Sequence, residues 1–177
     1  MAATDLFYHH GIRAVGVDAI AEAAGTNKMT LYRHFASKDE LVAEYLRRLA
    51  RGVAAIWGEL AAKFPDDARA QLHGWLEIMS ARVGDPNMRG CALANAAVEL
   101  PEKSHPARSV IEECKCNVHD NLARLCRAAQ LQRPDLLADE LFVLLEGTQV
   151  CAQSFSANGP IFDLVRMGET LIDAHSS

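Results

Sequence analysis

Three fixed positive charges are concentrated in a short stretch of the chain, NKMTLYRHFASKDE, residues 27–40. They are Lys28, Arg33 and Lys38, and no acidic residue occurs from Ala23 to Lys38. Ammonium and guanidinium groups donate strong hydrogen bonds to carboxylate and phosphate oxygens. The composition of this stretch is therefore typical of a surface that binds an anion.

Apolar side chains occupy the same stretch at spacings that suit a buried helix face. They are Met29, Leu31, Tyr32 and Phe35. Asn27 can cap the start of such a helix, because its side chain accepts a hydrogen bond from an N–H group of the first turn. We therefore expect a short helix that is packed on one face and cationic on the other.

Helical periodicity dominates the whole chain, and no convincing alternating strand is found. Gly25 suits the left-handed conformation that follows many helix ends, and Ser37 with Glu40 forms a capping box for the next helix. The predicted helices span residues 2–10, 17–24, 28–35, 38 to about 65, 67–83, 91–100, 107–131, 135 to about 156 and 161–174.

The order of these helices predicts an all-α fold. Two short helices joined by a tight glycine-containing turn form a helix-turn-helix, whose second helix enters the DNA major groove. We expect an N-terminal three-helix DNA-binding unit over residues 1–46, which one long helix joins to a helical body over residues 47–177. A solvated helical hairpin without DNA is the alternative that spacing alone leaves open.

Composition places the chain among ordinary globular proteins, with 177 residues, 50% hydrophobic and 23% charged. The net charge of −5 argues against a protein coated with nucleic acid. Residues 1–48 hold six basic and six acidic residues, whereas residues 49–177 hold twelve and seventeen. The basic character is therefore local.

Cysteine usage and the absence of targeting signals predict a cytoplasmic protein. The five cysteines form no small-disulfide pattern, so we interpret them as reduced thiols. No apolar run approaches the ~20 residues of a membrane span, and the N-terminus lacks the pattern of a secretory signal.

The stretch AATDLFYHHGIRAVGVDAIAEAAGTNKMTLYRHFASKDELV resembles the N-terminal domain of the tetracycline-repressor (TetR) family of transcriptional regulators. The resemblance covers residues 2–42, and a weaker one, GCALANAAVEL and HPAR, lies in the body. It implies a homodimer that binds double-stranded DNA at a palindromic operator. It also implies a repressor, less often an activator, that responds to a small molecule in the body.

The resemblance implies DNA contacts for some residues of this stretch more directly than for others. Tyr32 and Lys38 match positions that contact phosphate, and Thr30 matches one that often faces DNA. Asn27, Lys28 and Arg33 occupy positions that vary within the family, so DNA contacts there are inferred from the residues alone. His34 suits packing at the helix junction as well as it suits DNA contact. The full predicted DNA-binding set is Gly16, Val17, Asn27, Lys28, Thr30, Tyr32, Arg33, His34 and Lys38.

Two departures from the family pattern remove phosphate contacts. Val15 and Gly16 stand where many members have threonine or serine, so contacts there would come from backbone N–H groups at the start of the helix. The sequence also begins almost at the first helix, so the basic arm that many members carry is either missing from this member or lies outside this sequence. We therefore expect weaker DNA binding.

Wide apolar stripes on the last two helices predict the dimer interface, with core packing as the alternative. The proposed contact residues are Leu137, Leu141, Leu144, Leu164 and Leu171. A two-fold dimer would place two reading helices one DNA turn apart, roughly 34–36 Å.

Aromatic residues and isolated polar groups in apolar surroundings predict a site for an apolar or aromatic effector. The candidates are Tyr45, Trp57, Trp75, Met79, Cys91, Asn95, Phe142, Glu146 and Gln149. Each of them also suits the core or the rim. A DNA-binding protein without an effector remains a further alternative.

Cys91 at the start of a helix suits a reactive thiolate, so a redox- or electrophile-sensing regulator is the alternative mechanism. Cys116 and His119 share a helix face, but Cys114 does not, so we expect no metal site. No phosphate-binding glycine loop, nucleophile elbow or zinc-protease motif occurs, and we expect neither a cofactor nor enzymatic activity.

Overall fold

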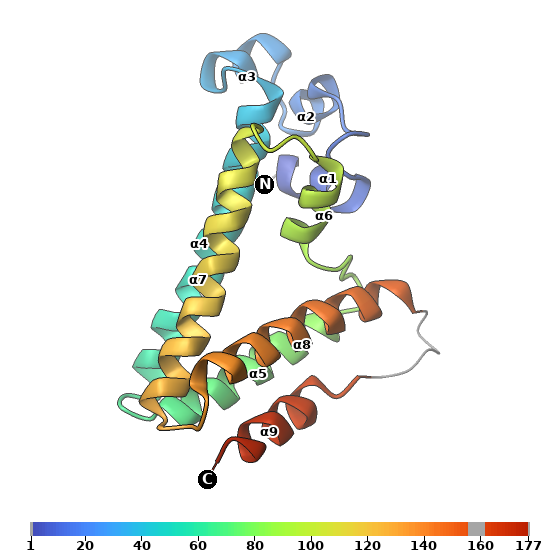
Figure 1. Cartoon of the computed structure of the whole chain (residues 1–177). Helices are drawn as coiled ribbons and strands as arrows, with labels where there is room; N and C mark the ends of the chain where they lie inside the picture. Colours follow the sequence, from blue (N-terminus) through green and yellow to red (C-terminus); the bar gives the residue numbers. More distant parts are fainter. Residues whose placement is uncertain (1, 156–161, 177) are drawn as a thin grey trace. The chain divides into compact units, whose positions relative to one another are not determined.

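The computed structural model describes residues 2–155 and 162–176, and this part of the chain consists of helices and connecting turns without a strand. The all-α prediction is therefore confirmed (Figure 1). The helices are α1 (Ala2–His10), α2 (Val17–Ala23), α3 (Lys28–His34), α4 (Lys38–Lys63), α5 (Ala68–Val83), α6 (Ala92–Glu99), α7 (Pro106–Ala128), α8 (Pro134–Ser154) and α9 (Leu164–Ala174).

Helix ends explain most differences from the predicted ranges. The helix predicted to reach Leu131 ends at Ala128, because Gln130 adopts a left-handed conformation with φ 56°. The N–H of Leu131 then donates to the carbonyl of Cys126 at 3.1 Å, and the Leu131 side chain is buried. This bond pattern with an apolar contact is the Schellman ending of a helix.

The last helix begins later than predicted. Asp163 caps α9 by accepting a hydrogen bond from the N–H of Arg166 at 2.9 Å, so residues 162–163 precede the helix. The predicted start at Ile161, like the predicted end of the preceding helix at Ser156, lies outside the described residues.

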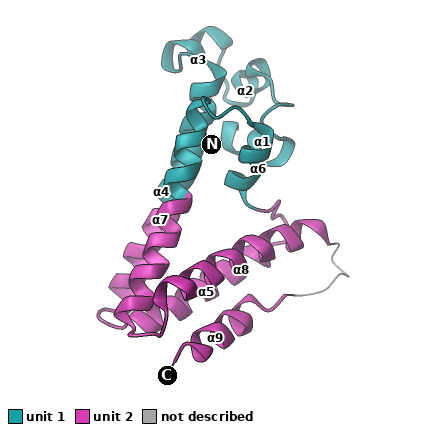
Figure 2. Ribbon diagram, viewed as in Figure 1, with its two compact units in different colours: residues 1–52, 91–114 teal, residues 53–90, 115–177 magenta. Residues whose placement is uncertain are grey.

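The chain forms two compact units, shown in Figure 2. Unit 1 comprises residues 1–52 and 91–114, and unit 2 comprises residues 53–90 and 115–177. Unit 1 thus combines the N-terminal helices with α6 and the first part of α7. The expected boundary between residues 46 and 47 remains a prediction.

Unit 1 has its own apolar core. Helices α1, α2 and α4 contribute Phe7, Ile20 and Leu46, each nearly inaccessible to solvent. The core is completed from the second segment of the unit by Leu93, Ala96, Leu100, Ala107, Val110 and Ile111.

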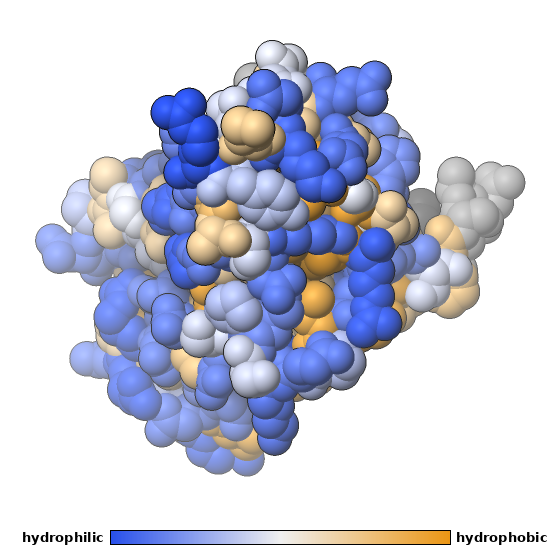
Figure 3. Space-filling view, turned by 90° about the horizontal axis from the view of Figure 1, so that it is seen from above, coloured by the Kyte–Doolittle hydropathy of each residue, from blue (hydrophilic) through white to orange (hydrophobic). Residues whose placement is uncertain are grey.

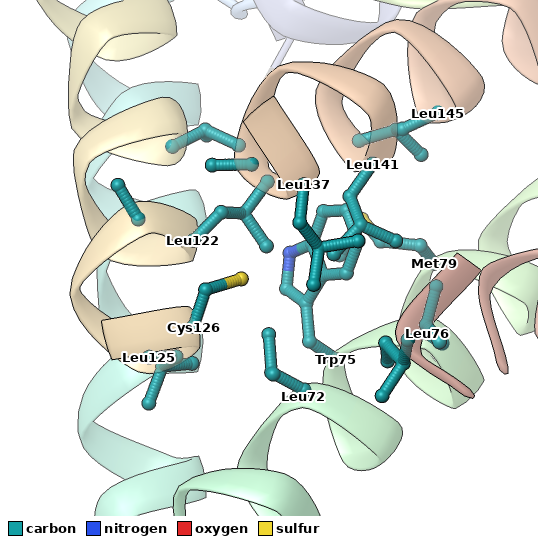
Figure 4. Packing of buried hydrophobic residues seen from close by; sticks show 14 of the residues in the cluster. Leu72, Trp75, Leu76, Met79, Leu122, Leu125, Cys126, Leu137, Leu141 and Leu145 are labelled. Carbon is teal, nitrogen blue, oxygen red and sulfur yellow. The ribbon is translucent and has the colours of Figure 1, made fainter. Parts of the chain in front are cut away.

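Unit 2 is built around a larger core contributed by α4, α5, α7, α8 and α9. Figure 4 shows the Trp75 indole between leucines of α5 and those of α8. Burial of the thiol raises the pKa of Cys126 to about 11, so this cysteine is a small apolar core residue rather than a nucleophile.

Close packing of α9 on α5 depends on a glycine. A Cβ atom at Gly168 would lie 2.5 Å from Cδ2 and 2.7 Å from Cδ1 of Leu76. Leu76 is fully buried, so it has little room to move away.

We predict that Gly168→Ala is less stable than Gly58→Ala by about 1–3 kcal/mol in urea unfolding, because only position 168 is overpacked. Gly58 is the matched control: it lies in α4, is exposed, and has no atom within 4 Å of the new Cβ. Both substitutions gain similar helix propensity, up to about 1 kcal/mol. Equal free energies of unfolding would contradict this account of the α5–α9 contact.

Candidate nucleic-acid interface

Helix α3 is short and depends on its cap. The side chain of Asn27 accepts a hydrogen bond from the N–H of Thr30 at 2.9 Å. The helix ends at Phe35, whose backbone is extended. Gly25, with φ 65°, makes the tight turn that separates α2 from α3, as the sequence predicts. These contacts build the helix-turn-helix.

No residue of α3 is buried. Leu31 and Phe35, two residues of the predicted apolar face, are half-buried. Met29 is 76% exposed and Tyr32 is 45% exposed. The prediction that Met29 belongs to a buried face is therefore wrong, because residues 29 and 32 lie on the side of α3 away from the core.

The three basic residues have different surroundings. The Lys28 ammonium lies 3.2 Å from the carboxylate of Asp18 on α2. The Lys38 ammonium donates to the carbonyl of Ile12 at 2.7 Å, which fastens the start of α4 to the α1–α2 connection. Arg33 is exposed and has no acidic partner within salt-bridge distance among residues 2–155 and 162–176.

Three further predicted residues also lie at the surface of unit 1. Gly16 is exposed and precedes α2 with an extended backbone and no side-chain cap, and Val17 is half-buried. His34, at the end of α3, is exposed. Figure 3 shows a face of the molecule on which hydrophilic side chains predominate, with smaller apolar areas between them.

A contact that the sequence does not reveal joins α6 to the connection between α1 and α2. The backbone N–H of Arg13 donates to the Glu99 carboxylate at 2.9 Å, and its guanidinium donates to the Glu99 carbonyl at 2.8 Å. A Cβ at Gly11, where φ is 85°, would lie 3.2 Å from the same carboxylate. Because 86 residues separate Arg13 from Glu99, no local pattern predicts this contact.

Predicted effector residues are divided between the two units. Tyr45, Cys91 and Asn95 belong to unit 1. Tyr45 is buried beside Phe7, with ring centroids 5.4 Å apart. Burial raises the pKa of Tyr45 well above its usual value, and the nearby Tyr8, Cys91 and Glu99 contribute.

Trp57 and Trp75 form a stacked pair in unit 2, with ring centroids 6.1 Å apart and Met79 in the same cluster. The indole N–H of Trp57 is buried and has no hydrogen-bond acceptor among the described residues. A buried donor without an acceptor costs about 1–3 kcal/mol, so this atom is an unusual feature of an apolar core.

Phe142, Glu146 and Gln149 of α8 are half-buried. Glu146 forms an ion pair with Lys115 of α7, and the Lys115 ammonium lies 5.8 Å from the centroid of the Phe142 ring. His119 contacts Asp139 at 2.7 Å, and no group of three potential metal ligands occurs within the described ranges.

Cys91 directly precedes α6 and is half-buried. The preceding residue, Gly90, has φ 70° and belongs to the turn that leads into the helix. The carbonyl of Cys91 accepts the first hydrogen bond of α6, from the N–H of Asn95 at 2.9 Å.

The predicted dimer residues are placed largely in the chain's own core. Leu137, Leu141 and Leu164 have no exposed surface, while Leu144 and Leu171 are half-buried against the same core. Residues already buried within one chain cannot provide new contact area to a second one. The apolar residues that α8 exposes are instead Leu136, Val143 and Val150, spaced by seven, and α9 exposes Met167.

Comparison with known proteins agrees with this architecture. The profile of bacterial regulatory proteins, tetR family, matches residues 1–45. The solved structure of a TetR-family transcriptional regulator from Streptomyces coelicolor superimposes with a TM-score of 0.88 at 27% identity, over 99% of this chain and 93% of that one.

The chain belongs to the TetR family of bacterial transcriptional regulators.

Curated relatives of this TetR-family chain include both kinds of regulator. The transcriptional activator FasR of Mycolicibacterium smegmatis is 31% identical over 130 residues, 70% of this chain and 57% of FasR. The transcriptional repressor KstR2 of Mycobacterium tuberculosis is 49% identical over 45 residues, 25% of this chain and 22% of KstR2. The chain thus spans little more than half of FasR and less than a quarter of KstR2. None of the described helices is long and apolar enough to cross a membrane.

Proposed function

We propose that this TetR-family regulator represses transcription as a homodimer that binds a palindromic operator and is released by a small molecule. The DNA-binding part of this proposal rests on the exposed, cationic surface of α3. This helix is capped at its N-terminus and exposes its outer face, and Arg33 on that helix has no acidic partner among the described residues.

DNA contacts would come from the surface around α3. Arg33 is available for phosphate or base edges, while Lys28 would exchange Asp18 for a phosphate. Tyr32 can donate its hydroxyl, and Lys38 retains two further donors beside its bond to Ile12. Gly16, Val17, Asn27, Thr30 and His34 complete the proposed interface.

Self-association would use the exposed strip on α8. Leu136, Val143 and Val150 follow one another at seven-residue intervals, and nothing lies within 4 Å of a Cβ at Gly147. Apolar residues at this spacing lie on one side of a helix, and a small residue allows close approach. Two-fold pairing through this strip would replace Leu137, Leu141 and Leu164 as the proposed contacts.

An effector would bind at the tryptophan pair of unit 2. The Trp57 N–H is a buried donor that needs an acceptor, and the rings of Trp57 and Trp75 provide an apolar surface. An aromatic compound with one carbonyl or ether oxygen fits this chemistry. Phe142, Glu146 and Met79 of the same unit are the further candidates.

Thiol sensing is the second candidate mechanism. Cys91 directly precedes α6, and Glu99 at the other end of α6 bonds to Arg13 in the connection between α1 and α2. Oxidation at Cys91 would therefore act on a helix that is bonded to the connection leading into α2. The favoured mechanism remains a non-covalent effector, because it also accounts for the Trp57 donor.

For DNA binding, we predict that Arg33→Ala weakens operator affinity about tenfold or more. It should also reduce the slope of log affinity against log salt concentration by about two, because the homodimer loses two arginines. The operator would first be selected by the purified protein from random DNA, and affinities measured by fluorescence anisotropy from 50 to 200 mM salt. Arg48→Ala, an exposed arginine of α4, is the control and should leave affinity unchanged. Asp18→Asn should strengthen binding, because it releases Lys28.

For the dimer, we predict that Val143→Asp weakens self-association at least about 100-fold, since a two-fold interface contains the substitution twice. Sedimentation velocity would show monomers. Val98→Asp is the matched control, because Val98 is an 83% exposed valine on α6, outside the strip. Loss of the dimer in both variants, or in neither, would count against the α8 strip.

For the effector, we predict that 1-indanone binds about fivefold to tenfold more tightly than indane, which lacks the oxygen. Trp57→Phe keeps a ring and removes the donor, so it should abolish this preference. Calorimetry would measure both ligands. Peroxide-induced release of DNA that Cys91→Ser prevents would instead support thiol sensing.

A further inference from the structure

We propose that Met29 reads the 5-methyl group of a thymine, so that each operator half-site contains a thymine recognised by apolar contact. This inference rests on the proposed DNA binding by α3 and names one of the bases that α3 reads. It assigns a recognition role to a residue whose sequence pattern suggests burial.

Met29 is unusual because it is a large apolar side chain in a cationic surface. It is 76% exposed, and among the large apolar residues that the structure describes only Val98 has a greater exposed fraction. The packing of α3 uses Leu31 and Phe35 instead, so Met29 contributes little to the core. An apolar surface that the fold leaves in water is available to a partner.

Neighbouring side chains at the start of α3 are already engaged. The Asn27 side-chain oxygen accepts the N–H of Thr30, and the Lys28 ammonium is paired with Asp18. Thr30 is half-buried. In the first turn of α3, Met29 is therefore the exposed side chain that no capping bond or ion pair holds in place.

The position of Met29 suits contact with a base edge. Residues 29, 32 and 33 are separated by three and four positions, so they share one face of α3. A seven-residue helix is about 10 Å long, which corresponds to about three base pairs. In helix-turn-helix proteins the N-terminal part of the recognition helix contacts base edges. Met29 lies in that part.

The chemistry of the major groove then selects the base. Guanine, cytosine and adenine present hydrogen-bonding groups there, and thymine also presents a methyl group. A flexible thioether side chain has no strong donor or acceptor and adapts its shape to an apolar surface. Burial of one methyl group corresponds to about a fourfold gain in affinity.

Replacing thymine by deoxyuridine tests this proposal, because it removes only the methyl group. Operators selected from random DNA would be synthesised with deoxyuridine at one thymine position at a time in both half-sites. Affinities would be measured for the full chain, Met29→Ala and the control Tyr32→Phe. Met29 is exposed, so its replacement by alanine should leave the melting temperature unchanged.

We expect one thymine position at which deoxyuridine weakens binding by the wild-type chain and by Tyr32→Phe about fourfold per half-site. Met29→Ala should show less than a twofold change at that position. An equal deoxyuridine effect in Met29→Ala, or no effect in the wild-type chain, would overturn the role of Met29. If no sequence is enriched from random DNA, the proposed DNA binding itself fails, and Met29 then has no base to read.

Discussion

A helix that reads DNA has to keep its outer face unpacked, and this constraint governs how unit 1 is built. Isolated helices as short as α3 are marginal in water. Helix α3 buries no residue, so its position depends on the Asn27 cap, the half-buried Leu31 and Phe35, and the turn at Gly25. The stable core lies beneath it, in α1, α2 and α4.

The ion pair beside α3 can be exchanged for a contact with a DNA phosphate. The Lys28–Asp18 pair is exposed on both sides, and such pairs contribute only about 0–1 kcal/mol. A phosphate can therefore replace Asp18 at little cost. Lys38 differs, because its bond to the Ile12 carbonyl fastens α4 to the turn before α2. The three basic residues thus have three physical roles, although they look equivalent in the sequence.

Helix α8 shows how one helix provides both a core and a surface. Leu137, Leu141 and Leu145 are buried within unit 2, whereas Leu136, Val143 and Val150 are exposed. Both sets are apolar, so periodicity marks a wide stripe without showing where the chain's own core ends. Unit 2 assigns the two sides by packing α8 on α5 and α9.

The sequence by itself determined the all-α fold, the order of its helices and the helix-turn-helix, because caps, glycine turns and helical periodicity are local. Asn27 and Gly25 act within four residues, so their effects can be predicted from the sequence. Only the tertiary structure decided that Met29 faces outward, that Asp18 reaches Lys28, and that Glu99 holds Arg13. These outcomes depend on which faces of separate helices meet, and side-chain type alone does not specify that.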